Sequence, residues 1–376
     1  MTTAMGNPFT FSELAVNEAF CNREEEQKEL SSHALNKANV VLYSPRRYGK
    51  TSLAKRVQAA VAKKGVVALY MDFFGVDSVG GIVEQIVSCF YKYCHVHKKT
   101  KWFLSGLRPI MRIDPQDGSA SFSVEPAEKR RGIDLLREVL EEFGKAAKSH
   151  KDGFHVVFDE FQELTEIPEA RQIEGVMRSS IQTHSNISYF FVGSRRRILL
   201  AMFNEKKRPF FQSAVNYALG PLLEEQAVGF IIERFKAGGK KCPPDIARDI
   251  YTSVSGYPFY VQRIPYSIYE VSQGNVIGLD DYHRGFAKAI EEQKAYYESL
   301  LVPLSIQQKR LFTAISDEPT ANPFAIEYMF NHNLGSYGGV QGAFKNLLNL
   351  DYVEKRADGR YCVVDPVFGK WHSQRS

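Results

Sequence analysis

The sequence predicts an α/β fold built on a parallel β-sheet, followed by a helical region and a small unit of helices and a hairpin. Short apolar runs, typical of buried strands, alternate with amphipathic helical patterns through the first half of the 376 residues. From about residue 222 to residue 299 the patterns are wholly helical. Beyond residue 301, three helical patterns precede an alternating segment centred on a turn sequence.

The elements expected in the sheet region are short strands with helices between them. Val40–Tyr43 is apolar and ends at a turn that contains proline. The expected strands are 40–43, 66–71, 154–158 and 187–192, and the expected helices are 51–64, 82–93 and 134–148. Strands separated by helices favour a parallel sheet covered on both faces. The segment 110–124 alternates around Asp117-Gly118, which predicts an inserted β-hairpin.

The last part of the chain has the plan of a winged helix. Helical patterns over 305–315, 323–330 and 338–350 are followed by a hairpin pattern over 352–365 around Asp358-Gly359. We therefore expect an α/β core over 1–221, a helical lid over 222–300 and a winged-helix-like domain over 301–376.

The composition indicates a globular protein of a reducing compartment. Hydrophobic residues make up 44% of the chain and aromatic residues 12%, which excludes a disordered or fibrous protein. The five cysteines are scattered and form no CxxC pair, as expected for free thiols. We see no leader peptide or membrane span and expect a cytoplasmic protein.

A phosphate-binding loop is predicted between the first strand and the first helix of the sheet region. Backbone N–H groups at a helix N-terminus attract phosphate, and Gly49 permits close approach. Lys50 would reach the β- and γ-phosphates and the Thr51 hydroxyl would ligate Mg²⁺. The loop residues are Ser44, Pro45, Arg46, Arg47, Tyr48, Gly49, Lys50, Thr51 and Ser52. Ser44 stands where the GxxxxGKT pattern has its first glycine, and the alternative is a loop that contains Gly-Lys-Thr by chance.

A second motif lies about a hundred residues later, where an apolar strand ends in Asp159 and Glu160. We expect this strand to lie beside strand 40–43, with its carboxyl end at the phosphates. Asp159 would hold Mg²⁺, and Glu160 would polarise the attacking water. Alone these acids would suit a turn or helix cap, but their spacing from Lys50 favours a site for ATP with Mg²⁺.

At this point the chain resembles the archaeal-type ATPase family, a branch of the AAA+ and STAND P-loop ATPases. The residues that carry the resemblance are Phe20-Cys21-Asn22-Arg23-Glu24, Pro45 to Ser52, Phe158 to Glu163, Gly193-Ser194 and Gly256-Tyr257-Pro258. The resemblance covers most of the chain. It implies a P-loop NTPase sheet, a helical lid and a C-terminal winged helix.

The resemblance also implies roles for residues outside the two motifs. The segment from Phe20 to Glu24, with Arg23, would lie near the adenine. Ser194 would act as a sensor of the γ-phosphate, and Pro258 would face the nucleotide from the lid. One arginine of Arg195, Arg196 and Arg197 would serve a neighbouring subunit as an arginine finger. Each role has a structural alternative. Arg23 would only start a helix, Pro258 would only belong to a turn, and the three arginines would only form a solvent-exposed face.

The distribution of charged residues does not identify the macromolecular partner. From residue 301 to the end, basic residues exceed acidic ones by one, which is a weak footprint for DNA. A basic segment with Trp102 and Phe103 is a second candidate for nucleic acid, or else a solvated face. Its basic residues are Lys92, Lys98, Lys99, Lys101, Arg108 and Arg112. Cys94, His95 and His97 lack a second ligand pair, so no zinc site is expected.

The function expected from these features is an ATP-binding and ATP-hydrolysing switch that couples nucleotide state to a DNA or protein partner. One alternative is a nucleic-acid-binding protein whose ATP site is vestigial, which Ser44 would favour. Another is a scaffold that forms homo-oligomers with ATP.

Overall fold

The computed structural model describes residues 6–11, 21, 23–96, 107–113, 120–126, 132–356 and 358–375. The contacts of the chain divide it into two units. The first, here called the sheet unit, comprises residues 24–44 and 50–219. The second, the helical unit, comprises residues 1–23, 45–49 and 220–376. Each unit is described by itself.

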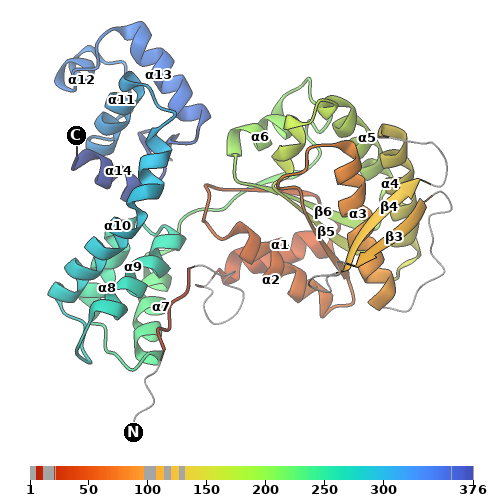
Figure 1. The fold of residues 1–376 in the computed structure, drawn as a ribbon, viewed down its shortest axis with the longest axis horizontal. Coiled ribbons are helices and arrows are strands. Elements are labelled where there is room, and N and C mark those ends of the chain that lie inside the picture. The colour runs from red at the N-terminus through yellow and green to blue at the C-terminus, as the bar shows by residue number, and fades with distance from the viewer. Residues whose placement is uncertain are drawn as a thin grey trace. The chain divides into compact units, whose positions relative to one another are not determined.

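The sheet unit is built on a five-stranded parallel sheet of order β2-β5-β6-β1-β7 (Figure 1). Its strands are β1 (Val40–Tyr43), β2 (Val67–Asp72), β5 (Phe154–Asp159), β6 (Ile187–Gly193) and β7 (Val215–Ala218). All residues of β5 and β6 are buried, because helices cover both faces of the sheet.

The helices of this unit follow the strands in the right order for crossover connections. They are α1 (Glu24–Leu35), α2 (Lys50–Ala62), α3 (Val79–Val96), α4 (Ile133–Ser149), α5 (Ala170–Thr183) and α6 (Arg196–Asn204), with a short 3₁₀ helix, η1 (Phe161–Glu166). Val156 and Phe158 of β5 join one core with α3, α4 and α5. Val157 lies between them in the strand and is also fully buried, so both faces are packed.

The inserted hairpin is present as β3 (Leu107–Ile113) paired antiparallel with β4 (Ala120–Pro126). This pair forms a separate two-stranded sheet and does not extend the parallel one. The predicted turn at Asp117-Gly118 lies outside the described residues.

The helical unit begins with α7 (Glu224–Ala237), α8 (Pro244–Val254), α9 (Pro258–Val271) and α10 (Leu279–Leu301). The winged-helix elements follow as α11 (Ile306–Asp317), α12 (Ile326–Asn331), α13 (Tyr337–Asn349), β8 (Val353–Lys355), β9 (Tyr361–Val363) and α14 (Pro366–Ser373). One hydrophobic core contains both sets, with Ile250 and Ile264 from the first and Leu311 and Val340 from the second. Within the described residues, no helix is both long and apolar enough to cross a bilayer.

The predicted fold class is confirmed, and each strand and helix named from the sequence is present with small shifts at its ends. One expectation about the sheet is wrong. Strand β5 does not lie beside β1, because β6 pairs with both and stands between them. The three-part division at residues 221 and 300 remains a prediction, since the contacts define two units.

Candidate functional site

The carboxyl edge of the sheet brings the sequence motifs of the sheet unit together. Strands β1, β5 and β6 are parallel and neighbours in the order β5-β6-β1, so their carboxyl ends share one edge. Ser44, Glu160 and Ser194 are the residues that follow these strands. Side chains from three separate stretches of sequence therefore gather where such sheets bind ligands.

Lys50 opens α2 directly after the loop. Its side chain is buried, with 6% of its surface exposed, and its Nζ donates to the carbonyl oxygen of Ser44 over 3.1 Å. The positive φ angles of the loop fall at Arg47 (62°) and Gly49 (82°) and not at Ser44. A glycine is therefore not required at position 44, and the departure from GxxxxGKT leaves the backbone geometry of the loop intact.

Thr51 and Asp159 meet at the same edge. Thr51 Oγ1 donates to Asp159 Oδ2 over 2.6 Å, and the Tyr70 hydroxyl donates to the same oxygen over 2.6 Å. Burial, together with the Asp159 charge, raises the pKa of Tyr70, so its hydroxyl stays protonated and remains a donor. A threonine hydroxyl beside a carboxylate is the pair of oxygen ligands that Mg²⁺ takes in phosphate loops. These residues therefore fit a nucleotide-bound Mg²⁺.

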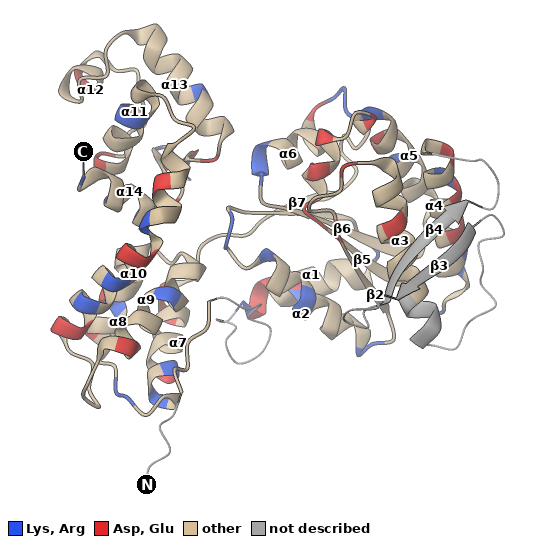
Figure 2. Ribbon diagram, viewed as in Figure 1, with Lys and Arg blue, Asp and Glu red and all other residues tan. Residues whose placement is uncertain are grey.

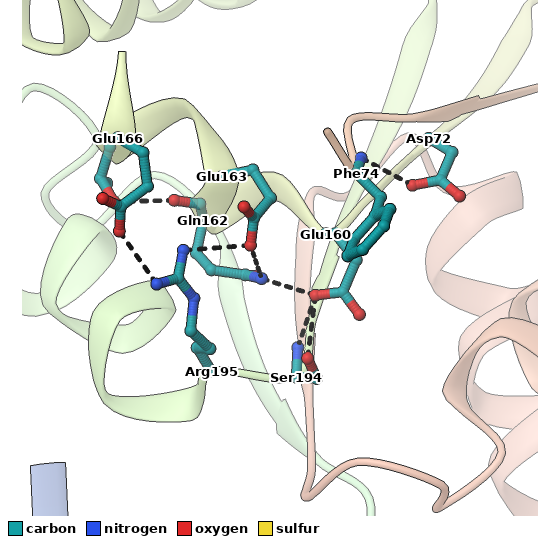
Figure 3. A network of polar contacts seen from close by, with 9 residues as sticks. Asp72, Phe74, Glu160, Gln162, Glu163, Glu166, Ser194 and Arg195 are labelled. Carbon is teal, nitrogen blue, oxygen red and sulfur yellow. Dashed lines mark hydrogen bonds and ion pairs between the residues drawn. The ribbon is translucent and has the colours of Figure 1, made fainter. Parts of the chain in front are cut away.

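Glu160 is held in a strained backbone conformation by its neighbours. Its φ of 47° and ψ of 42° are left-handed, which a non-glycine residue adopts at a cost. Its Oε2 accepts from Ser194 Oγ over 2.9 Å, from the Ser194 N–H over 3.3 Å and from Gln162 Nε2 over 2.5 Å. Figure 3 shows Gln162 and Ser194 both bonded to this one oxygen of Glu160. The carboxylate is thus oriented by groups on η1 and at the end of β6.

Gly193, the last residue of β6, permits this arrangement. A Cβ atom at that position would lie 2.0 Å from Gln162 Oε1. A side chain at this position would therefore displace the Gln162 amide, which donates to Glu160.

Arg195 is anchored within the sheet unit. Its Nη2 lies 3.0 Å from Glu163 Oε1 and its Nη1 lies 2.9 Å from Glu166 Oε1 (Figure 3). An arginine tied to two glutamates of its own chain is a poor candidate for reaching a neighbour. Arg196 and Arg197 open α6, and Arg197 is exposed.

Sequence reasoning missed two acidic or polar members of the site, Asp72 and Gln162. Asp72 ends β2 and pairs in register with Asp159. Partial burial raises the pKa of Asp72, the Phe74 N–H opposes that shift, and the Asp159 and Glu160 carboxylates raise it further. The signal was available for Asp72, since an apolar strand ending in an acid is the same pattern that identified Asp159.

The other predicted site residues belong to the helical unit. Arg23 is buried and its Nη2 donates to the carbonyl oxygen of Gly220 over 2.8 Å. Pro258 is the first residue of α9. Among the loop residues of this unit, Pro45 and Tyr48 are buried and Arg46 and Arg47 are exposed. Ser52 is buried in α2 of the sheet unit. The predicted adenine contacts Phe20 and Asn22 lie outside the described residues.

The predicted basic segment from residue 92 to residue 112 falls where the structure does not describe side chains. Nucleic-acid binding there stays a prediction. The same holds for the expectation about Cys94, His95 and His97.

Comparison with known proteins identifies the C-terminal part. The family model described as "Probable winged helix domain" matches residues 295–374. This confirms the winged helix that the sequence predicts. No curated protein matches the sequence of this chain.

Solved structures share the fold over nearly the whole chain. A Walker-type ATPase of Pyrococcus abyssi has a TM-score of 0.71 at 16% identity, over 97% of this chain and 99% of that one. The ORC2 protein of Aeropyrum pernix in its ADPNP–ADP complexes has a TM-score of 0.57 at 16% identity, over 95% of both chains. Its ADP form gives 0.51 at 15% identity, over 96% of both. At this identity the likeness establishes a shared fold.

Proposed function

We propose that this chain binds ATP with Mg²⁺ at the phosphate loop and hydrolyses it, and that the nucleotide state controls binding of a macromolecular partner. The observation that carries the proposal is the contact between Thr51 and Asp159, because it joins the loop to the acidic strand end. The Aeropyrum pernix structure with the same fold was solved with ADPNP and ADP. This supports nucleotide binding by a chain of this architecture.

The proposed roles follow from the chemistry of each side chain. Lys50 neutralises phosphate charge, and the backbone N–H groups at the start of α2 add the positive end of a helix. Thr51 and Asp159 would hold Mg²⁺, which neutralises the charge that develops on the phosphates. Asp159 is already the acceptor of two hydroxyl hydrogen bonds, so its carboxylate is oriented before any ion binds.

Glu160 is the proposed general base for the attacking water. A carboxylate fixed by hydrogen bonds needs little reorganisation to take up a proton from water. Ser194 and Gln162 supply that fixation. Because Ser194 directly follows β6, the strand next to β5, its hydroxyl is also the proposed sensor of the γ-phosphate.

The test is ATP turnover by the wild type, Lys50→Ala and Glu160→Gln under the same conditions. Removing a general base costs roughly 10²–10⁴ in rate, so Glu160→Gln should turn over ATP at that reduced level while it still binds ATP. Lys50→Ala should bind ATP at least roughly tenfold more weakly and lose turnover. Equal rates in all three proteins would contradict hydrolysis at this site.

For the partner, the exposed surface of the winged helix favours a protein over DNA. Ile306, Ile326 and Phe330 expose 73%, 87% and 82% of their surfaces. An open pocket of about 440 Å³ is lined by Ile326, Met329, Phe330, Asn333 and Gly335. None of these lining residues is charged, and most of the ribbon of α12 and α13 in Figure 2 carries neither basic nor acidic residues.

DNA binding requires cations for the phosphate backbone, and α13, the predicted recognition helix, carries Lys345 as its one charge. We therefore propose that an apolar segment of a protein partner docks in the pocket formed by α12 and the turn that follows it. Titration with duplex DNA at several salt concentrations, with and without ATP, separates the two partners. Affinity that falls steeply with salt and weakens with Lys345→Ala, but not with Phe330→Asp, would favour DNA instead.

A further inference from the structure

The side chain of Arg47 in the phosphate loop packs on aromatic residues of the helical unit. Its guanidinium carbon lies 4.4 Å from the ring centroid of Phe259 on α9 and 4.5 Å from that of Tyr296 on α10. Its Nη1 donates to Gln293 Oε1, also on α10, over 3.4 Å. Two cation–π contacts and a hydrogen bond therefore fix an arginine whose backbone is in the left-handed region.

The neighbouring loop residues bind the start of α9. The ring of Tyr48 meets that of Tyr257 edge-on, with 4.6 Å between centroids. The Tyr257 hydroxyl donates to the carbonyl oxygen of Arg46 over 2.6 Å. Burial, reinforced by the Asp365 charge, raises the pKa of Tyr257, which therefore remains a donor to this carbonyl. A backbone acceptor of the loop is thus bonded to the side chain of the N-cap residue of α9.

From Tyr257 a buried path leads to the winged helix. The rings of Tyr257 and Tyr260 lie 5.2 Å apart, and the Tyr260 hydroxyl is 2.8 Å from that of Tyr297 on α10. Tyr260 also donates to Asp365 Oδ2 over 2.7 Å. Asp365 Oδ1 in turn accepts from the N–H groups of Val367 and Phe368 over 3.0 and 2.9 Å. Asp365 is therefore the N-cap of α14, the last helix of the winged-helix domain.

We propose that this chain of contacts, from Arg47 and Tyr48 through Tyr257, Tyr260 and Tyr297 to Asp365, transmits the nucleotide state of the loop to the winged helix. The proposal rests on ATP binding at the loop, as argued above. Gly49 and Lys50 are consecutive, so a phosphate bound by Lys50 acts on the same loop whose Arg46 carbonyl accepts from Tyr257. A shift of that carbonyl changes the Tyr257 hydrogen bond. Because the Tyr257 ring packs on the Tyr260 ring, the shift reaches the hydroxyl network of Tyr260, Tyr297 and Asp365 at the cap of α14.

The hydroxyls of Tyr260 and Tyr297 lose free energy if they are left without a hydrogen-bond partner. The network therefore changes by exchanging one set of hydrogen bonds for another and not by gradual loosening. Tyr257 is the N-cap of α9, Tyr260 lies in α9 and Tyr297 lies in α10, and side chains of both helices contact Arg47. Arg47 and the tyrosines therefore act as positioning residues, which set the winged helix without contacting phosphate themselves.

The experiment is hydrogen exchange at the backbone amides of α14, with and without ATP and Mg²⁺, in the full chain. In the wild type we expect ATP to change the exchange rates there by roughly three- to tenfold, the equivalent of one hydrogen bond. Tyr260→Phe, which removes the hydroxyl shared by Tyr297 and Asp365, should abolish this response. Tyr297→Phe, which removes one bond and keeps Tyr260 on Asp365, is the milder variant and should reduce it.

Tyr269→Phe is the matched control. Tyr269 lies on the same helix, and its hydroxyl donates to Gly238 at a distance of 2.9 Å, away from Asp365. It should keep the full response of α14. ATP binding is measured calorimetrically on the same samples.

If the wild type binds ATP and α14 does not respond, or responds equally in Tyr260→Phe and Tyr269→Phe, the coupling path is overturned and the ATP site stands. If the wild type does not bind ATP, the proposed function fails, and the path fails with it.

Discussion

Thr51 and Asp159 are 108 positions apart in sequence, yet Thr51 Oγ1 donates to Asp159 Oδ2 over 2.6 Å. The first residue after Lys50 and the last residue of β5 thus share a hydrogen bond at the carboxyl edge of the sheet. This bond forms although β6 separates β5 from β1, because α2 starts at the loop and carries Thr51 toward β5. The hydrogen bond between Thr51 and Asp159 can therefore be tested by removing a single hydroxyl group.

Thr51→Val removes the hydroxyl and keeps the shape of the side chain. We expect ATP affinity in the presence of Mg²⁺ to fall roughly tenfold, the value of one hydrogen-bonded or ligating oxygen near charge. Affinity measured in a chelator should change little, because the ion is then absent from both proteins. Thr183→Val on α5, whose hydroxyl bonds to Ser180 of its own helix, is the control. Equal losses with and without Mg²⁺ would contradict a metal role for Thr51.

Ser194→Ala tests the orientation of Glu160. Loss of the hydroxyl removes one donor to Glu160 Oε2, so turnover should fall about tenfold while the affinity for ATP changes by less than about twofold. Ser188→Ala is matched to it, since Ser188 is buried in β6, the strand that Ser194 follows, and its hydroxyl donates to the carbonyl oxygen of Ala38 near the opposite end. A comparable drop in turnover for both variants would mean that the effect comes from the strand as a whole.

Gly193→Ala places a methyl group where the Gln162 amide lies. The clash of 2.0 Å must displace Gln162 and take its Nε2 away from Glu160. We expect slower turnover and a lower melting temperature. The control is Gly175→Ala on α5, where nothing lies within 4 Å of the added atom. That change should stabilise the protein by up to about 1 kcal/mol, because alanine favours a helix over glycine. Unchanged turnover in Gly193→Ala would separate Gln162 from the chemistry.

The parts of the site that were predictable from sequence are those set by local pattern. A short apolar run followed by Gly49-Lys50-Thr51, and another followed by Asp159, identify strand ends without knowledge of the fold. The order of the strands could not be predicted in this way, because strand pairing depends on contacts between segments that are distant in sequence. No local sequence pattern indicates that β6 lies between β1 and β5. The expectation that β5 lies beside β1 was therefore wrong, although Thr51 and Asp159 are still in contact.

Two other structural features had no sequence pattern from which they could be predicted. Strand β7 has only four residues, and its sequence Val-Asn-Tyr-Ala is too short for an apolar run or an alternation to identify it. Gln162 follows the strand end inside a 3₁₀ helix, and its contact with Glu160 depends on the left-handed backbone there. The packing of Arg47 on Phe259 and Tyr296 likewise depends on tertiary structure, and the sequence placed Arg47 only among the residues of the phosphate-binding loop.

His155, buried in β5, makes the sheet unit sensitive to acid. Burial, with a smaller contribution from the charge of Lys37, lowers its pKa from 6.5 to about 3. The folded protein therefore keeps the ring neutral, and the unfolded chain takes up a proton below pH 6.5. Stability from this group is full above pH 6.5 and is lost as the pH falls from 6.5 toward 3.

We expect His155→Phe to lose less stability than the wild type between pH 7 and pH 5, by about 2 kcal/mol. Urea unfolding at the two pH values measures this difference. The His184 ring, whose pKa burial lowers to about 4, is retained in both proteins and cancels in the comparison. Parallel losses of stability in the two proteins would show that His155 does not carry the acid response.

The most direct measurement of the central claim is a calorimetric titration of the wild type and Lys50→Ala with ATP and Mg²⁺. The wild type should bind one ATP per chain, and Lys50→Ala should bind at least roughly tenfold more weakly, because a buried charge-assisted contact to phosphate is lost. Absence of binding by the wild type, or equal affinity in the two proteins, would contradict an ATP site at this loop.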